Sequence, residues 1–538
     1  MNFAITHGQL ARNVSSSEDP ETGLFYDILG FDPRGVNNTT PKVSCFPDLF
    51  SQLTWNLQKA AQGEAITSES FHAVFNRLQG LAVTCSNKIS QGSDGVNEIG
   101  KFISTPYVVE DMIEIVERHG EWREAEAKRI LSARPKGCKS ADAEDKQTLE
   151  RIKWRKGQEK VQYWGFSYGT ILGMTLSTMH PNRIHRAIFD GVADVDDYYS
   201  GRKTQFSRAL PLGANMPVGK WETNLLDTDK IMTRFFNLCF EAGAESCPLF
   251  SPDGPTSIES TVLTFLEDLK TNPIPVVASP PYGPDLITYT DIADEIRGAL
   301  YTSAQFPLIA GYIADLIKGN GTALATSKQS EYRQSCRNQK CHAPFPKAFM
   351  MDAGPAIICT DAPDMTNATN LDFKNRWLAL KNQSAFLGEF WVEVTSQCAN
   401  WHVRSKWNFT DIRENIGANT AHPILFTSNT LDPVTPLRNA FKMSGKFNGS
   451  VVLVQESEGH CTMQTVSVCL AKHAREYFQT GKLPAKGEVC DGRKNPFVSE
   501  PADALAMGDL LSAGDRELAR ILKEFNNGER WGGGFLGI

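Results

Sequence analysis

The sequence has no long hydrophobic run and no long block of basic residues. None of its apolar stretches approaches the roughly 20 residues that a membrane-spanning helix requires, so we expect no membrane partner. The chain carries a formal net charge of -7 and lacks an extended Lys/Arg segment, so we expect no nucleic-acid partner. With 538 residues, 41% of them hydrophobic, it is long enough for a large core and an inserted subdomain.

Spacings that are typical of metal sites are absent as well. The 10 histidines are scattered without a His-x-x-x-His pair, and the 12 cysteines contain no Cys-x-x-Cys pair. The sequence therefore predicts neither a metal nor any other cofactor.

A secretion signal is also lacking at the start, where residues 1–8 have neither a basic stretch nor a long apolar core. Other features nevertheless favour an oxidising, extracellular compartment, because 12 cysteines are many for a cytosolic enzyme. Eight Asn-x-Ser/Thr acceptor sequences for glycosylation begin at Asn13, Asn37, Asn38, Asn320, Asn367, Asn382, Asn408 and Asn448. We therefore expect a secreted glycoprotein with disulfide bonds.

The most informative stretch is a β-prone run from residue 161 that ends in Gly-x-Ser-x-Gly and leads into a helix-like segment over 171–180. A strand that feeds directly into a helix makes a tight turn, which lifts one side chain above the sheet. Gly165 and Gly169 are the small residues that such a turn needs. Ser167, between them, is the predicted nucleophile.

A serine nucleophile requires a base and an orienting acid, which α/β-hydrolases supply downstream in the order acid, then histidine. Asp432 follows an apolar run that begins at Pro423, and His460 follows a strand-like run over 451–455. We therefore predict a catalytic triad of Ser167, Asp432 and His460. The alternative is that these are three unrelated loop residues.

These residues also carry a resemblance to the tripeptidyl aminopeptidase-like (TAP-like) family of secreted α/β-hydrolase serine peptidases, which is related to prolyl aminopeptidases. The resemblance extends from about residue 25 to about residue 490. Besides the Gly-x-Ser-x-Gly turn, it rests on the stretches 31–35 (FDPRG), 189–192 (FDGV), 359–362 (CTDA), 432–437 (DPVTPL) and 459–461 (GHC). It implies an α/β-hydrolase fold, in which helices cover a mostly parallel sheet and a helical cap is inserted.

A second acidic residue competes for the place in the triad. Asp190 follows a predicted strand over 187–191, and some α/β-hydrolases place the acid after this strand. The resemblance implies Asp432 instead, with Asp190 as a structural turn residue.

In the resembled family, three strands and a Gly-rich loop precede the strand that corresponds to residues 25–31, and the loop supplies one of two oxyanion amides. The sequence before residue 25 contains no such loop, so we expect an N-terminally incomplete version of the fold. The alternative is a divergent protein that uses residues 1–22 differently. Residues 201–219 are absent from the family pattern and are either a surface loop or an untranslated segment read through.

We divide the chain into four parts on this basis. Residues 1–200 form the N-terminal part of the hydrolase core with the nucleophile turn, and residues 408–497 form its C-terminal part. Residues 201–407 form a mostly helical cap, and residues 498–538 form a helical tail. The charged segment 121–160 predicts solvated helices joined by a loop. Other helices are predicted over 106–119, 227–242, 257–270, 290–301, 306–317 and 502–526.

The cysteines offer several disulfide pairs, although spacing alone does not define connectivity. Reasonable pairs are Cys45–Cys85, Cys239–Cys247, Cys336–Cys341 and Cys359–Cys398. The resemblance implies that Cys469 pairs with Cys490, because the family also pairs its late cysteines. Cys461, beside His460, then stays unassigned, and a role as thiol nucleophile is disfavoured.

We therefore expect a serine exopeptidase, an aminopeptidase that releases short peptides from the N-termini of peptides or proteins through an acyl-enzyme. The backbone N–H of Tyr168 is one predicted oxyanion donor, because it follows the nucleophile at the start of a helix. Loss of the second donor puts the activity of this chain in doubt. The alternatives are a carboxylic-ester hydrolase on the same fold and a truncated or catalytically silent homologue.

Substrate-binding residues are less well defined by the sequence. The candidates for an apolar side-chain pocket are the cap aromatics Trp377, Phe386, Phe390, Trp391 and Trp401, although core packing is the commoner role for such residues. The candidates for holding the substrate's α-ammonium are Glu389, Glu393, Asp361 and Asp364. The oligomeric state is not predicted.

Overall fold

A computed structural model describes residues 15, 24–26, 28–63, 67–90, 98–133, 139–200, 221, 223–277, 282–332, 335–337, 340–342, 352–407, 416–492, 494–498, 515–516 and 518–522. Three predictions fall largely outside these residues. They concern residues 1–22, the insertion at 201–219 and most of the helix at 502–526.

The centre of the molecule is a five-stranded sheet with the order β1-β2-β7-β8-β9, in which every neighbouring pair is parallel. The strands are β1 (Val161–Phe166), β2 (Ile184–Asp190), β7 (Leu425–Leu431), β8 (Val451–Glu458) and β9 (Val489–Asp491). Parallel strands covered on both faces are buried along most of their length, as β2 and β7 are. The predicted α/β-hydrolase fold class is confirmed.

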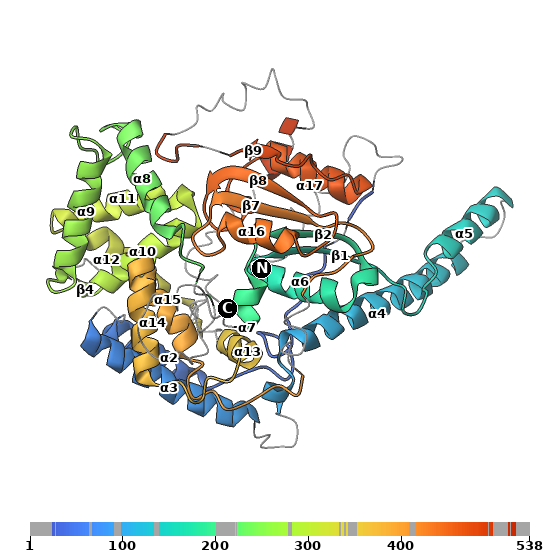
Figure 1. Ribbon diagram of the computed structural model, residues 1–538, viewed down its shortest axis with the longest axis horizontal. Helices are drawn as coiled ribbons and strands as arrows, with labels where there is room; N and C mark the ends of the chain where they lie inside the picture. Colours follow the sequence, from blue (N-terminus) through green and yellow to red (C-terminus); the bar gives the residue numbers. More distant parts are fainter. Residues whose placement is uncertain are drawn as a thin grey trace.

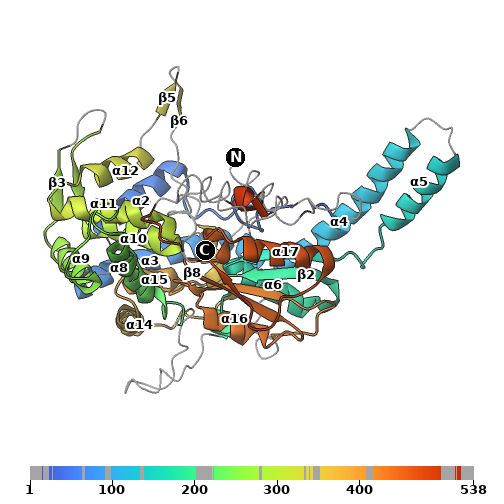
Figure 2. The same cartoon turned by 90° about the horizontal axis from the view of Figure 1, so that it is seen from above.

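Helices cover both faces of this sheet (Figures 1 and 2). Because side chains alternate along a strand, Ile188 of β2 packs toward α17 (Val468–Thr480), whereas its neighbour Phe189 packs toward α6 (Tyr168–Met179). On the same side as Phe189 lies α16 (Leu437–Ser444), which follows β7 directly.

A long helix, α4 (Thr105–Ser132), begins against the core and then leaves it. Val108, Val109 and Met112 in its first turns are buried, as the helical spacing predicts. Its distal part pairs with α5 (Lys139–Arg151) in an arm that projects from the body (Figures 1 and 2). The charged segment therefore forms solvated helices, as predicted.

The chain between β2 and β7 is mostly helical, and the predicted helices in it are confirmed to within a few residues. It begins with α7 (Val195–Ser200), α8 (Thr228–Ala242), α9 (Pro255–Leu269), β3 (Ile274–Val276) and β4 (Asp285–Ile287). It continues with α10 (Tyr289–Tyr301), α11 (Phe306–Ile317), α12 (Thr322–Tyr332), β5 (Ser335–Arg337) and β6 (Lys340–His342). It ends with α13 (Ala353–Asp361), α14 (Asn370–Gln383) and α15 (Gly388–Ser396). The hairpins β3–β4 and β5–β6 were not predicted.

Two early helices pack on this inserted segment rather than on the sheet. They are α2 (Leu49–Gln62) and α3 (Ser68–Ser90). α3 lies against α14 and α15 (Figure 1), and Lys59 of α2 pairs with Glu393 of α15. Phe71 of α3 stacks on Trp377 of α14 with ring centroids 5.4 Å apart. The boundary placed at residue 200 therefore separates α2 and α3 from their packing partners, because apolar surface decides which elements join and chain order does not.

The strand predicted over 25–31 is wrong for the residues described there. Residues 24–26 and 28–33 have no strand assignment, and Phe25 and Leu29 are exposed. The Tyr26 hydroxyl donates to the carbonyl oxygen of Phe478 at 2.7 Å, and Leu24 exchanges hydrogen bonds with the Gln479 side chain. A β-prone segment becomes a strand only beside another strand, and here its partner is helix α17.

Four disulfide bonds occur in the described part of the chain: Cys45–Cys85, Cys239–Cys247, Cys359–Cys398 and Cys469–Cys490. All four match predicted pairs. Cys336 and Cys341 are opposite each other in the β5–β6 register, but the placement of their side chains is not described. No helix among the described residues is both long and apolar enough to cross a bilayer.

Candidate active site

The turn between β1 and α6 has the geometry of a nucleophile elbow. Ser167 adopts φ 52° and ψ -119°, a backbone conformation that residues other than glycine rarely adopt. A Cβ atom at Gly165 would lie 2.5 Å from the carbonyl oxygen of Gly169, so a larger residue cannot fit there. At Gly169 the added atom would meet only the Tyr163 hydroxyl, at 3.3 Å, so this glycine is less strictly required.

The elbow is anchored to the neighbouring strand. The Ser167 N–H donates to the carbonyl oxygen of Asp190 at 3.0 Å, and the Thr170 N–H donates to the carbonyl oxygen of Ser167 at 2.8 Å. The N–H of Tyr168, the predicted oxyanion donor, belongs to the first turn of α6, where backbone N–H groups have no acceptor within the helix.

Asp432 and His460 meet at the same edge of the sheet. Asp432 directly follows β7 and His460 closely follows β8, so both lie at the carboxyl ends of parallel strands, as Ser167 does. The Nδ1 atom of His460 is 3.0 Å from Asp432 Oδ1 and 3.1 Å from Oδ2. Both side chains are buried.

Backbone N–H groups hold the Asp432 carboxylate. Oδ1 accepts from Val434 at 3.0 Å and from Thr435 at 2.7 Å, and Oδ2 accepts from Cys461 at 2.9 Å. Burial by itself would raise the pKa of Asp432, but His460 and these N–H groups hold it below its usual value. Asp432 therefore stays ionised beside the imidazole.

Thr435 was not predicted from the sequence. Its Oγ1 lies 3.2 Å from His460 Nδ1, and it closes the turn that begins at Asp432. The Asp432 side chain accepts from the N–H groups two and three residues further on, which is a common aspartate turn. The DPVT sequence could therefore have indicated that Thr435 lies beside Asp432.

Asp190, the rival acid, has other partners. Its carboxylate accepts from the Thr462 N–H at 2.7 Å and from Thr462 Oγ1 at 2.5 Å. Burial raises its pKa to about 6, although the bonds from Thr462 oppose the rise. The structure therefore brings Asp432, and not Asp190, against His460.

Cys461 is a buried free thiol, with Sγ 3.6 Å from the carbonyl oxygen of Asp190. Burial raises its pKa well above the usual value, and the charges of Asp190 and Asp432 raise it further. A thiolate is therefore disfavoured. Gly191 lies so close that an added Cβ would be 2.4 Å from the sulfur, so Cys461 fills a packing position.

A cavity opens at Ser167. It is lined by Ser167, Tyr168, Ile171, Ala193, Trp221, Asn224, Tyr301, Trp391, Val394, Val434 and Thr435. Trp391 is the one predicted cap aromatic among these residues, whereas Trp377 and Trp401 are buried in the core. Trp221, Asn224 and Tyr301 were missed, because they reach the site only through the packing of distant segments.

None of the four acids proposed for the α-ammonium is among the described residues that line this cavity. Glu389 pairs with Lys381 at 2.7 Å, and Glu393 pairs with Lys59 at 3.1 Å. Asp364 bonds to Thr366. Each of these three carboxylates already has a partner, from the cap in two cases and from α2 in the case of Glu393.

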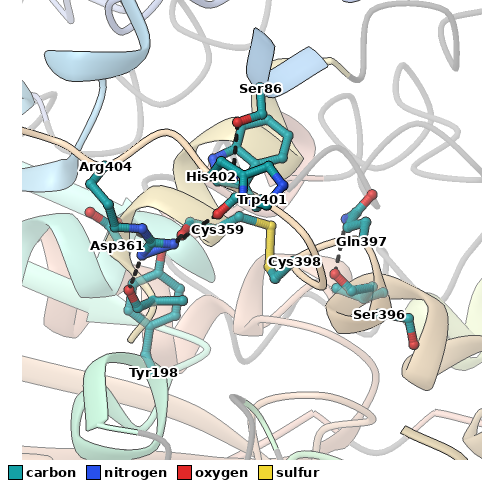
Figure 3. Close-up of a disulfide and its surroundings, with 12 residues drawn as sticks. Ser86, Tyr198, Cys359, Asp361, Ser396, Gln397, Cys398, Trp401, His402 and Arg404 are labelled. Carbon is teal, nitrogen blue, oxygen red and sulfur yellow. Dashed lines mark hydrogen bonds between the residues drawn. A yellow bond between two sulfur atoms is a disulfide. The ribbon is translucent and has the colours of Figure 1, made fainter. Parts of the chain in front are cut away.

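Asp361 is linked to the cavity residue Tyr168 through the Thr105 hydroxyl. It is fully buried and accepts from the Thr105 N–H and from the Tyr198 hydroxyl, both at 2.9 Å. Figure 3 shows it next to the Cys359–Cys398 disulfide, with Tyr198 pointing at the carboxylate. It is a structural anchor between α4, α7 and α13.

The sheet and the elbow define a serine hydrolase or peptidase of the α/β-hydrolase type, and comparisons with known proteins agree. Residues 384–490, which include Asp432 and His460, match the family model described as TAP-like protein. The chain therefore carries a TAP-like domain.

Relatives extend the likeness to most of the chain. It is 21% identical over 470 residues to serine protease Hip1 of Mycobacterium tuberculosis, covering 86% of this chain and 74% of the relative. It is 22% identical over 492 residues to tripeptidyl aminopeptidase of Streptomyces lividans, covering 88% and 72%. A putative hydrolase of Escherichia coli, YuaR, is 20% identical over 446 residues, covering 81% and 67%.

Proposed function

We propose that the protein is a serine exopeptidase that removes short peptides from the N-termini of peptides or proteins. The observation that carries this proposal is the buried pair of His460 Nδ1 and the Asp432 carboxylate, 3.0 Å apart, at the sheet edge that also holds Ser167. The relatives named serine protease and tripeptidyl aminopeptidase support peptides as substrates.

In this proposal, Ser167 Oγ attacks the carbonyl carbon of the scissile bond while His460 Nε2 accepts its proton. The tetrahedral intermediate collapses, the C–N bond breaks, and His460 returns the proton to the leaving amine. Water then attacks the acyl-enzyme ester and gives a proton to His460, which returns it to Ser167 Oγ as the ester bond breaks. Asp432 holds the Nδ1–H and stabilises the imidazolium, and the Tyr168 N–H donates to the oxyanion.

The test is a Ser167→Ala variant assayed with a tripeptidyl p-nitroanilide that has a free N-terminus. We expect hydrolysis to fall by at least about 10³-fold, because no other group forms the acyl-enzyme, while the melting temperature stays unchanged. Retained activity in the folded variant would overturn the assignment of the nucleophile. Blocking the substrate's N-terminus with an acetyl group tests the exopeptidase mode, since a blocked peptide should not be cleaved.

Two alternatives give different results in the same assays. A carboxylic-ester hydrolase would cleave p-nitrophenyl esters and leave the p-nitroanilide intact. A catalytically silent homologue would be folded but would not react with a fluorophosphonate probe for active-site serines.

We also propose that the protein is secreted and glycosylated. Four disulfide bonds in the described residues fit an oxidising compartment. Immunoblotting of the culture medium, with and without removal of N-linked glycans, tests both points. Protein confined to cell extracts, without a mobility shift, would contradict them.

A further inference from the structure

Asn224 presents an unused hydrogen-bond acceptor at the candidate active site. The residue is 5% exposed and lines the same cavity as Ser167. Its Oδ1 atom is buried and has no hydrogen-bond partner among the residues that the structure describes. A buried amide oxygen without a partner is costly and uncommon in folded proteins, so it calls for an explanation such as a bound ligand.

The segment that carries Asn224 is held from both sides. The N–H and Oγ1 of Thr223 donate to Asp197 Oδ2 at 3.2 and 3.1 Å, and the Leu225 N–H donates to Gln383 Oε1 at 3.1 Å. These bonds tie the segment to α7 and to the end of α14. The backbone on both sides of Asn224 is therefore tied to these two helices.

Trp221, three residues earlier, lines the same cavity with an unused donor. Its indole Nε1 is buried without a partner in the described part of the chain. Its φ of 61° is unusual for a bulky residue, and backbone strain of this kind is common at functional sites. The Nε1–H of Trp391 donates a hydrogen bond of 3.0 Å to the carbonyl oxygen of Trp221. A donor and an acceptor thus occur on one short segment, as recognition of a peptide unit requires.

The remaining lining is uncharged. None of the described residues around the cavity carries a carboxylate or a basic group, and aromatic and aliphatic side chains form most of the wall. An ammonium group brought into this cavity would lose water without gaining a counter-charge. An amide N–H needs only one acceptor, so the cavity favours the amide.

We propose that Asn224 Oδ1 accepts a hydrogen bond from the backbone N–H of the substrate residue whose carbonyl is attacked, and that this residue's uncharged, apolar side chain fills the cavity. The inference rests on the peptidase function proposed above. It makes Asn224 a specificity-determining residue, because the single N–H of an acylated nitrogen satisfies Asn224 Oδ1 without bringing a charge into the cavity. The ammonium of a free N-terminal residue could also donate to Oδ1, but it would be buried there without a counter-charge. The enzyme then releases peptides rather than single amino acids.

The experiment uses two tripeptidyl p-nitroanilides with free N-termini that end in the same apolar residue. In one of them, the amide N–H before this residue is replaced by an ester oxygen. We expect wild-type kcat/KM to be about 5- to 100-fold lower for the ester-containing substrate, the range for one buried hydrogen bond. The Asn224→Leu substitution should lower kcat/KM for the amide substrate by a similar factor. The variant enzyme should then cleave the two substrates almost equally.

Asn439 supplies a matched control, because it is also buried and its Nδ2 lacks a partner in the described residues, but it does not line the cavity. Asn439→Leu should keep the wild-type ratio between the two substrates. If Asn224→Leu does not fold, Asn224→Ser should also lose the discrimination.

The outcomes separate the two proposals. Equal discrimination by wild type and a folded Asn224 variant would overturn the role of Asn224 and leave the peptidase function standing. Failure of the wild type to cleave either peptide would overturn both. Better cleavage of a single amino-acid p-nitroanilide than of the tripeptide would show that the cavity takes an ammonium group, which also contradicts the inference.

Discussion

The backbone N–H of His460 donates a hydrogen bond of 2.9 Å to the carbonyl oxygen of Tyr301. Tyr301 is the last residue of α10, and its ring also packs edge-on against the His460 imidazole, with centroids 5.0 Å apart. A second contact joins Thr228 Oγ1, on α8, to the carbonyl oxygen of Pro433 at 2.7 Å. Helices of the inserted segment therefore hold the loops of both the proposed base and the proposed acid.

Gly459 tests this connection. It has φ 116°, and an added Cβ would lie 2.9 Å from the Tyr301 carbonyl oxygen. We expect Gly459→Ala to cost about 1–3 kcal/mol of stability and to lower kcat/KM at least about 10-fold, because the His460 loop must move. Gly487→Ala is the control, since φ there is 84° but no atom lies within 4 Å. Equal loss of kcat/KM in both variants would argue against the close contact as the cause.

The two buried aspartates should respond differently to removal of their charge. Asp432→Asn should lower kcat by about 10³- to 10⁴-fold, because the Nδ1–H of His460 loses its acceptor and the wrong tautomer is favoured. Asp190→Asn should retain most activity, because its partner is Thr462. Steady-state kinetics on both purified variants decides the matter, and the reverse ranking would assign the triad's acid to Asp190.

Asp190 should also make stability depend on pH. Its pKa is raised to about 6 in the folded protein by burial, so between about pH 4 and 6 the native state binds a proton that the unfolded chain has lost. The contribution of Asp190 to folding stability therefore falls as the pH rises through this window. The free energy of unfolding, measured with urea, should decrease less from pH 4.5 to pH 7 for Asp190→Asn than for wild type. An unchanged decrease would mean that Asp190 is ionised throughout.

The disulfides should differ in their effect on stability. Cys359–Cys398 closes 39 residues of sequence and Cys239–Cys247 closes 8, so loop entropy predicts losses of about 4 and about 2.5 kcal/mol when each pair is replaced by alanine. Chemical denaturation of the two double variants measures the difference. A larger loss at Cys239–Cys247 would show that packing, rather than chain entropy, dominates.

The sequence determined the features that depend on neighbouring residues. Gly-x-Ser-x-Gly after a β-prone run predicted the strand–turn–helix at Ser167, and helical spacing placed α8, α9, α10 and α11 within a few residues. The order of Asp432 and His460 after two apolar runs placed both at strand ends, because parallel strands in one sheet align their carboxyl ends. Turns, spacing and chain order are local properties, so they can be read without the fold.

Tertiary structure alone decided what depends on distant segments. Residues 25–31 have the composition of a strand, but a strand forms only beside a partner, and this segment contacts α17. The cavity at Ser167 combines Trp221, Tyr301 and Trp391 from separate parts of the chain. Asn224 is a candidate acceptor for substrate only because its Oδ1 is buried at this cavity. Burial and the absence of a hydrogen-bond partner are properties of the packed chain, so no sequence pattern records them.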